Sequence, residues 1–296
     1  RNILSSDSRK NRDKVWMKRL QIIDTTTITL FSNLLFKGVG RHPKTGKKKG
    51  GIKVHTVIHA NEGVPSDIKF TSAATNDSFM LRPSVMNKGD IIAMDRAYID
   101  YEKLETLTQR EVMYVTKMKK NLKYNIIEDC MYQNDKGFME VRIQNVTFSK
   151  MLKDGTILIH HARIITYVDI KKHKLVSLLT NDMESDPNEI IGIYHKRWEI
   201  ELLFKQIKQN FPLKYFYGES ANAIKIQIWV TLIANLLLMV MKKKLTRSWS
   251  FSGLATMMRI TLMYYVDFYS LFNHPEKDWE TLLDVRQKED CQLSIF

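Results

Sequence analysis

The sequence predicts an α/β fold that carries an inserted antiparallel β domain and ends in apolar helices. Three observations lead to this class. The chain opens with β-branched, apolar runs, helix-like and strand-like segments then alternate, and short strand-like runs separated by turns interrupt the alternation after residue 118. The 296 residues, 44% of them hydrophobic, are enough for one large core with an insertion.

The first part of the chain predicts strands with short helices between them. Period-two alternation of apolar residues indicates strands, and Asn or Asp just before an apolar run indicates the start of a helix. The expected elements are strands at 16–30, 51–59 and 69–74, a helix at 79–86 behind Asn76, a strand ending at Asp95, a helix at 101–110 behind Asp100, and a strand at 112–118.

The predicted insertion is followed by helices. Asp186 and Pro187 predict the start of a helix that runs through Glu201, since proline is favoured in the first helical turn. Before this helix, the insertion is expected to contain strands at 140–147, 156–159, 162–168 and 174–179. After it, further helices are expected at 222–245 and 251–269.

These signals predict a domain organisation with one interrupted core. The chain begins with Arg1 rather than Met, which favours a missing upstream piece. The expected parts are 1–15 as a remnant of an N-terminal region or linker, 16–118 with 186–272 as the catalytic core, 119–185 as the inserted β domain, and 273–296 as a C-terminal tail.

One face of the helix near residue 200 is a candidate functional surface. Tyr194, Arg197, Glu201 and Lys208 fall within an arc of about 80°, while Glu199 points roughly the opposite way. A carboxylate among cationic and phenolic donors can hold a metal ion beside groups that bind phosphate. The alternative is an exposed face with an Arg197–Glu201 pair, which contributes little to stability.

Two aspartates are candidate partners for Glu201. Asp24 lies inside an apolar, β-branched run and Asp95 ends another, and a buried charge is costly unless it is paired or binds a metal. For Asp95 the alternative is a turn cap or a pair with Arg96. Three carboxylates without a matching Cys/His set favour Mg²⁺ or Mn²⁺. Two such ions suit the in-line displacement of a phosphodiester.

The net charge of +14 predicts a polyanionic partner. The alternative is a merely soluble basic protein, but the positive charge is clustered. The clusters are Arg9, Lys10, Arg12, Lys14, Lys18 and Arg19; Lys37, Arg41, Lys44, Lys47, Lys48, Lys49 and Lys53; Lys117, Lys119, Lys120 and Lys123; and Lys242, Lys243, Lys244 and Arg247.

Other features predict a cytoplasmic protein without a membrane span. Only Cys130 and Cys291 occur, which indicates no disulfide framework, and the sequence carries no signal peptide. The longest apolar stretch, 226–241, is short for a membrane span and contains polar residues, so a buried core helix is the better interpretation.

The ordered motifs resemble DDE-type insertion-sequence transposases that cut DNA through a hairpin. Tyr194, Arg197, Glu201 and Lys208 match the Tyr-x2-Arg-x3-Glu-x6-Lys (Y-R-E-K) signature in spacing. Residues 94–101 resemble the family's second-aspartate motif, with Ala97 where glycine is usual, and 23–26 resemble the first. The resemblance covers residues 20–245.

The resemblance implies a ribonuclease-H-like mixed sheet core with the inserted β domain between the second aspartate and the glutamate. It implies that Asp24, Asp95 and Glu201 are the catalytic residues and the ligands of two Mg²⁺ or Mn²⁺ ions. Tyr194, Arg197 and Lys208 are then expected to hold phosphates near the cleaved end. The other residues expected to contact DNA are Lys53, Arg96, Lys47, Lys48 and Lys49.

The implied partners are double-stranded DNA with the terminal inverted repeats of the protein's own element, target DNA, and a second copy in a synaptic homodimer. The implied location is the bacterial nucleoid. The sequence departs from relatives that stack a tryptophan of the inserted domain on a flipped base, because no tryptophan lies between residues 119 and 180. Tyr124, Tyr132 and Tyr167 are the remaining aromatic candidates.

Two other hypotheses stay open on the sequence alone. One is a structure-specific nuclease on the same core that performs no strand transfer. The other is a catalytically inactive DNA-binding remnant or regulator of the element.

Overall fold

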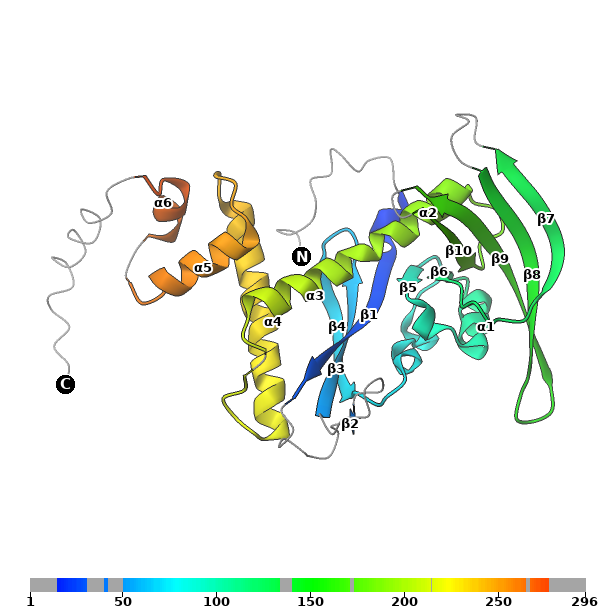
Figure 1. Cartoon of the computed structure of the whole chain (residues 1–296), viewed down its shortest axis with the longest axis horizontal. Coiled ribbons are helices and arrows are strands. Elements are labelled where there is room, and N and C mark those ends of the chain that lie inside the picture. Colours follow the sequence, from blue (N-terminus) through cyan, green and yellow to red (C-terminus); the bar gives the residue numbers. More distant parts are fainter. Residues whose placement is uncertain are drawn as a thin grey trace, which may run out of the picture. The chain divides into compact units, whose positions relative to one another are not determined.

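The structure, a computed structural model, describes residues 15–30, 40–41, 50–133, 140–170, 173–213, 215–264 and 267–276. It divides into two compact units whose boundary lies between Leu203 and Phe204. The larger unit contains the β-sheet, and the smaller one contains C-terminal helices (Figure 1).

The strands of the larger unit form one mixed sheet. Ten strands are found in the described part of the chain, in the order β2-β3-β1-β5-β6-β10-β9-β8-β7, with β4 also paired to β3. They are β1 Leu20–Thr29, β2 Gly40–Arg41, β3 Gly50–His59, β4 Val64–Ser72, β5 Ile91–Met94, β6 Met113–Lys117, β7 Asn125–Gln133, β8 Glu140–Met151, β9 Ile157–Asp169 and β10 Lys174–Thr180.

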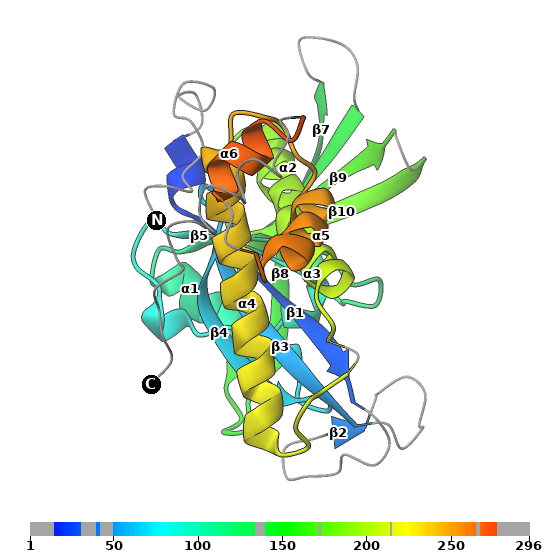
Figure 2. The ribbon, with the colours of Figure 1, turned by 90° about the vertical axis from the view of Figure 1, so that its left-hand side faces the viewer.

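The first strands have the arrangement of a ribonuclease-H-like core. β1, β3 and β4 pair antiparallel in sequence order, and lie side by side in Figures 1 and 2. β1 then pairs parallel with β5, and β5 parallel with β6. All four residues of β5 are buried, as expected for a central parallel strand covered on both faces. The mixed α/β class predicted from the sequence is confirmed.

The region between the second aspartate and Glu201 continues the same sheet. β10 pairs antiparallel with β6, and β9, β8 and β7 follow in turn (Figure 1). The two strands predicted at 156–159 and 162–168 are one strand, β9, since no turn separates them. β7 was not predicted, because its side chains are mostly exposed and lack an alternating apolar face.

Of the two helices predicted in the first part, one needs correction and the other is present. The helix predicted at 79–86 is instead two short 3₁₀ segments, η2 (Asp77–Met80) and η3 (Pro83–Val85). Proline in that stretch cannot donate a backbone hydrogen bond and crowds the turn before it. The helix predicted at 101–110 is present as α1, Tyr101–Gln109, although the Asp100 side chain makes no capping hydrogen bond.

The helix expected to run through Glu201 is two helices, which corrects the single-helix prediction. α2 spans Pro187–Lys196 and α3 spans Trp198–Asn210, with Arg197 between them (Figure 1). The Arg197 N–H donates to the carbonyl of Tyr194, 3.1 Å away, which is a tighter turn than the α-helical one. Arg197 itself keeps helical dihedral angles, so the chain passes directly from one helix into the next.

The smaller unit packs helices around a second apolar cluster. α4 (Ala221–Lys244) matches the predicted helix at 222–245, whereas the helix predicted at 251–269 ends early as α5 (Phe251–Thr261) and is followed by α6 (Phe268–Asn273). Leu238, Leu254 and Phe272 are buried together there.

Within the described residues, α4 alone is long and apolar enough to cross a membrane by length and composition. Core helices of soluble proteins meet the same two conditions. The polar side chains of Thr231 and Asn235 on α4 are buried, and Gln206 donates a 2.8 Å hydrogen bond to Asn235 within the same unit.

Candidate active site

Strand pairing brings the two predicted aspartates next to each other. Ile23 of β1 is in register with Met94 of β5 in the parallel pair. Asp24 and Asp95 each follow by one residue, so both lie where β5 ends while β1 continues. Buried apolar residues next to Asp24 hold it there, because Ile22 and Ile23, which precede it, and Met94 on the neighbouring strand have almost no exposed surface.

Arg197 connects Asp24 to Glu201 although the three residues come from distant parts of the sequence. Its Nη1 lies 3.3 Å from Oδ2 of Asp24, and its Nη2 donates to Oε1 of Glu201. The side chain of Arg197 is only 11% exposed, compared with 17% for Asp24 and 33% for Glu201. The guanidinium also lies 5.4 Å from the ring centroid of Tyr194. A cation therefore already balances the two carboxylates in a largely buried setting.

Burial raises the pKa of Asp24 to about 6. The backbone N–H of Thr25 donates to Oδ1 at 2.8 Å, and this bond and the charge of Arg197 favour the ionised form. The negative charges of Asp95 and Glu201 act in the other direction and raise the pKa further. Asp24 is thus close enough to both carboxylates for each to affect its ionisation.

A hydrogen-bonded network that the sequence did not reveal lies behind Asp24. Oγ1 of Thr25 is 2.6 Å from the hydroxyl of Tyr98 and 2.7 Å from Nδ1 of His55, and Nε2 of His55 is 2.6 Å from Oγ1 of Thr71. Burial lowers the pKa of His55 to about 4, so its ring is neutral near pH 7. The only feature of the sequence that pointed to this network is that Thr25 directly follows Asp24.

Tyr98 links the two elements that carry the aspartates. It belongs to the 3₁₀ segment η4, Arg96–Tyr98, which starts directly after Asp95, and its side chain is 1% exposed. Its hydroxyl bonds to the residue whose N–H holds the Asp24 carboxylate. Tyr98 therefore helps fix the position of Asp24 relative to Asp95.

Tyr98→Phe is expected to lower the free energy of unfolding by about 1 kcal/mol, because the hydroxyl of Thr25, which also bonds to His55, loses a buried hydrogen-bond partner. Urea denaturation measures this change. Tyr101→Phe is the matched control, since no hydrogen bond of the Tyr101 hydroxyl is found among the described residues. Equal losses for the two variants would contradict a specific role for the Tyr98 hydroxyl.

The raised pKa of Asp24 predicts a pH-dependent effect of Asp24→Asn on stability. Between about pH 4 and pH 6 the folded chain keeps a proton on Asp24 that the unfolded chain has released, so this group stabilises the fold less as pH rises. The lowered pKa of His55 acts oppositely in the same range. The free energy of unfolding of Asp24→Asn minus that of wild type should therefore increase by about 2 kcal/mol from pH 4 to pH 6.

Urea titrations in EDTA at several pH values measure this difference, in which the His55 contribution cancels. A difference that stays constant from pH 4 to pH 7 would mean that Asp24 is ionised throughout and that its burial has no such effect.

Other predicted residues lie elsewhere or are already engaged. Glu199 pairs with Lys196 at 2.7 Å and not with the Asp24 group. Lys53 pairs with Asp77 at 2.9 Å. Lys208 lies on α3 beyond the boundary of the larger unit, where burial lowers its pKa. Arg96 is exposed next to Asp95, and Lys47, Lys48 and Lys49 lie outside the described residues.

The donor set suits a hard divalent cation, but the side chains do not form a closed metal site as they stand. Among the described residues no three His, Cys, Asp or Glu side chains are gathered closely enough to hold a metal ion. The guanidinium of Arg197 lies between two of the carboxylates, so a metal ion there would replace it as their counter-charge. Oxygen ligands from Asp24, Asp95 and Glu201 fit Mg²⁺ or Mn²⁺ chemically.

Neighbouring aspartates on adjacent strands, one within β1 and one just after β5, with a glutamate on a later helix of a ribonuclease-H-like core, are the layout of the DDE class of proteins. The chain belongs to the transposase DDE domain family, whose model matches residues 16–237.

Curated relatives agree with this membership. The chain is 28% identical over 221 residues to a protein of Sinorhizobium fredii described as a transposase, covering 75% of this chain and 60% of the relative. It is 23% identical over 237 residues to a Geobacillus stearothermophilus protein described as a transposase for the insertion sequence element IS5377, covering 80% and 60%. The chain thus spans about three-fifths of the length of these relatives.

Among solved structures, the chain is similar to a piggyBac transposase in a synaptic complex with hairpin DNA. The sequence identity is 10%, the TM-score is 0.48, and the similarity covers 88% of this chain and 57% of that one.

Proposed function

We propose that the chain is the catalytic part of a DNA transposase that cuts and joins the ends of an insertion sequence. The observation that carries this proposal is the meeting of Asp24, Arg197 and Glu201, with Asp95 next in register, in a member of the transposase DDE domain family. Its expected partners are double-stranded DNA carrying the element's terminal inverted repeats, target DNA and a second copy of the chain. Its expected location is the bacterial nucleoid.

The proposed chemistry is phosphodiester transfer at Asp24, Asp95 and Glu201. When bound, two divalent ions supply charge neutralisation and an activated water for in-line displacement. Asp24 must be ionised to ligate, which its pKa of about 6 allows near pH 7. Arg197 and Tyr194 would hold phosphate oxygens near the cleaved end, and Lys208 is proposed to bind phosphate as well. The freed 3′ hydroxyl attacks the opposite strand to close a hairpin.

The test is incubation of the chain with labelled element ends and Mg²⁺, followed by denaturing gels. Nicks followed by hairpins support the transposase. Nicks without hairpins or strand transfer favour a nuclease on the same core. Intact DNA that is tightly bound favours a catalytically inactive DNA-binding regulator.

A further inference from the structure

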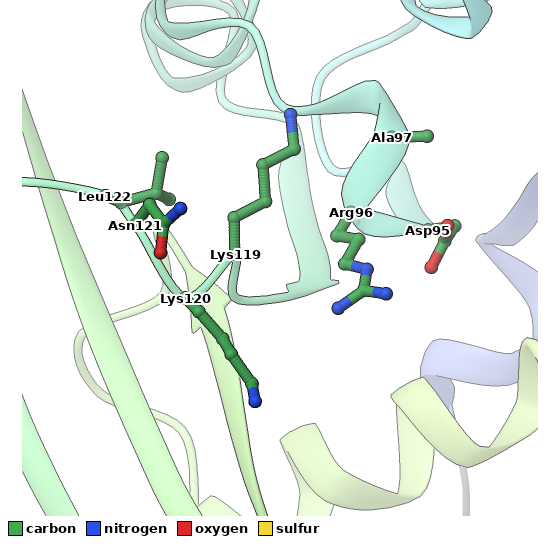
Figure 3. A pocket seen from close by; sticks show the side chains of 7 residues that line it. All are labelled: Asp95, Arg96, Ala97, Lys119, Lys120, Asn121 and Leu122. Atoms are coloured by element: carbon green, nitrogen blue, oxygen red, sulfur yellow. The ribbon is translucent and has the colours of Figure 1, made fainter.

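Two neighbouring cavities beside Asp95 are lined by cations from both the core and the inserted region. The first, of about 660 Å³, contains Asp95 and Arg96 on one wall and Lys119 and Lys120 on the other (Figure 3). The second, of about 630 Å³, shares Arg96, Lys119 and Lys120 with the first and adds Lys117 and Lys174. We call the set Arg96, Lys117, Lys119, Lys120 and Lys174 the cationic trough.

The trough residues come from elements that the fold holds in place. Lys117 is the last residue of β6, and the next residue, Met118, donates a backbone hydrogen bond of 2.9 Å to Ser177 of β10. This bond anchors the segment that carries Lys119 and Lys120. Lys174, the first residue of β10, also lines the second cavity. The lysines are therefore gathered by the strand pairing that joins core and insertion.

No trough cation forms an ion pair with a carboxylate in the described part of the chain. In Figure 3, Arg96 and Lys120 point to the same side of the first cavity, while Lys119 points the other way. Apart from Asp95 at one end, the two cavities bring like charges together, which raises the free energy of the empty site, and an anion that bridges the cations lowers it.

We propose that the cationic trough binds consecutive phosphates of the DNA strand that leaves the Asp95 side of the active site. The two cavities together suit a chain of phosphates better than one small anion, because the cations are spread from Asp95 to β10. The proposal rests on the proposed function for one assumption, which is that the reacting phosphate lies at Asp95. Two members of the trough, Lys117 and Lys174, also line a third cavity together with Tyr194 and Arg197, so the trough is continuous with the groups around Arg197.

The first test measures how DNA affinity depends on salt. Each lost phosphate contact should reduce the slope of log affinity against log salt by about 0.9. For a short duplex bound in Ca²⁺, the triple variant Lys117→Ala, Lys120→Ala, Lys174→Ala should flatten the slope by about two to three units. Lys123→Ala is the matched control, because Lys123 is exposed on the same segment but lines neither cavity.

A second test uses the unmodified chain, so that it does not depend on the folding of a variant. Lysines are acetylated with an N-hydroxysuccinimide ester, with and without DNA, and quantified by mass spectrometry. DNA should protect Lys117, Lys119, Lys120 and Lys174 several-fold and leave Lys123 reactive. Inorganic pyrophosphate at the same phosphate concentration should protect them far less.

Three results would overturn the trough proposal: an unchanged slope in the triple variant, equal effects of Lys123→Ala, or equal protection by pyrophosphate. The proposed function fails independently. If the chain binds DNA through the trough but never cuts it, the trough proposal stands and the proposed function fails. If the chain forms hairpins but the triple variant has an unaltered slope, the proposed function stands and the trough proposal fails.

Discussion

Glu201→Gln is expected to abolish DNA cutting while DNA binding stays intact or becomes slightly stronger. The substitution keeps the shape of the side chain but removes the charge that a hard metal ligand needs. A loss of several kcal/mol of transition-state stabilisation lowers the rate of DNA cutting by about a hundredfold to a thousandfold or more. DNA binding should not weaken, because one negative charge near the phosphates is gone. Cleavage gels and binding isotherms on the same DNA measure the two effects.

Glu199→Gln is the matched control for this experiment. It lies two residues away on the same helix, but its carboxylate pairs with Lys196 and not with Arg197. It should cut DNA at close to the wild-type rate. If Glu199→Gln abolishes cleavage and Glu201→Gln does not, the assignment of the third carboxylate is wrong.

Arg197→Ala should have the largest effect on the stability of the metal-free chain. Without the guanidinium, Asp24 and Glu201 face each other with no counter-charge in a largely buried setting. Removing one partner of such a group costs about 3 kcal/mol. The loss should be smaller at pH 5 than at pH 7, because Asp24, with a pKa of about 6, is then mostly neutral. Urea denaturation in EDTA at the two pH values measures both effects.

The control is Lys196→Ala, which breaks a more exposed pair and should cost less than about 1 kcal/mol. If Arg197→Ala and Lys196→Ala destabilise the chain equally, Arg197 does not serve as the counter-charge of the carboxylates. In DNA assays, Arg197→Ala should impair hairpin formation and strand transfer more than the first nick, because it also removes the charge-assisted phosphate contact proposed for Arg197.

The elements that could be predicted from the sequence are those with strong local signals. The β-branched run around Asp24 predicted β1, and the apolar stretch from residue 226 to 241 predicted α4. The i, i+4 spacing of Arg197 and Glu201 predicted their proximity, and they are hydrogen-bonded. In each case the determining interactions lie within a few residues of one another.

The features that escaped prediction depend on contacts between distant segments. Arg197 was expected to bind phosphate, and nothing in the sequence indicated that it would also reach Asp24 on β1. The Thr25–His55–Tyr98 network requires the β1–β3 register and the end of β5 to be known together. β7 is an exposed edge strand that is defined by its pairing with β8 and not by an apolar pattern of its own.

The pairing of β10 with β6 affects how freely this region can be exchanged or removed. An insertion joined by flexible linkers is a detachable module, whereas here Leu178, Leu179 and Thr180 complete the hydrogen bonding of Lys117, Thr116 and Val115. Removing residues 119–185 would leave β6 as a bare edge strand with unpaired backbone groups, which invites pairing with other chains. The shortened chain should therefore aggregate. Related chains are expected to differ in the outer strands of this region while they keep β10.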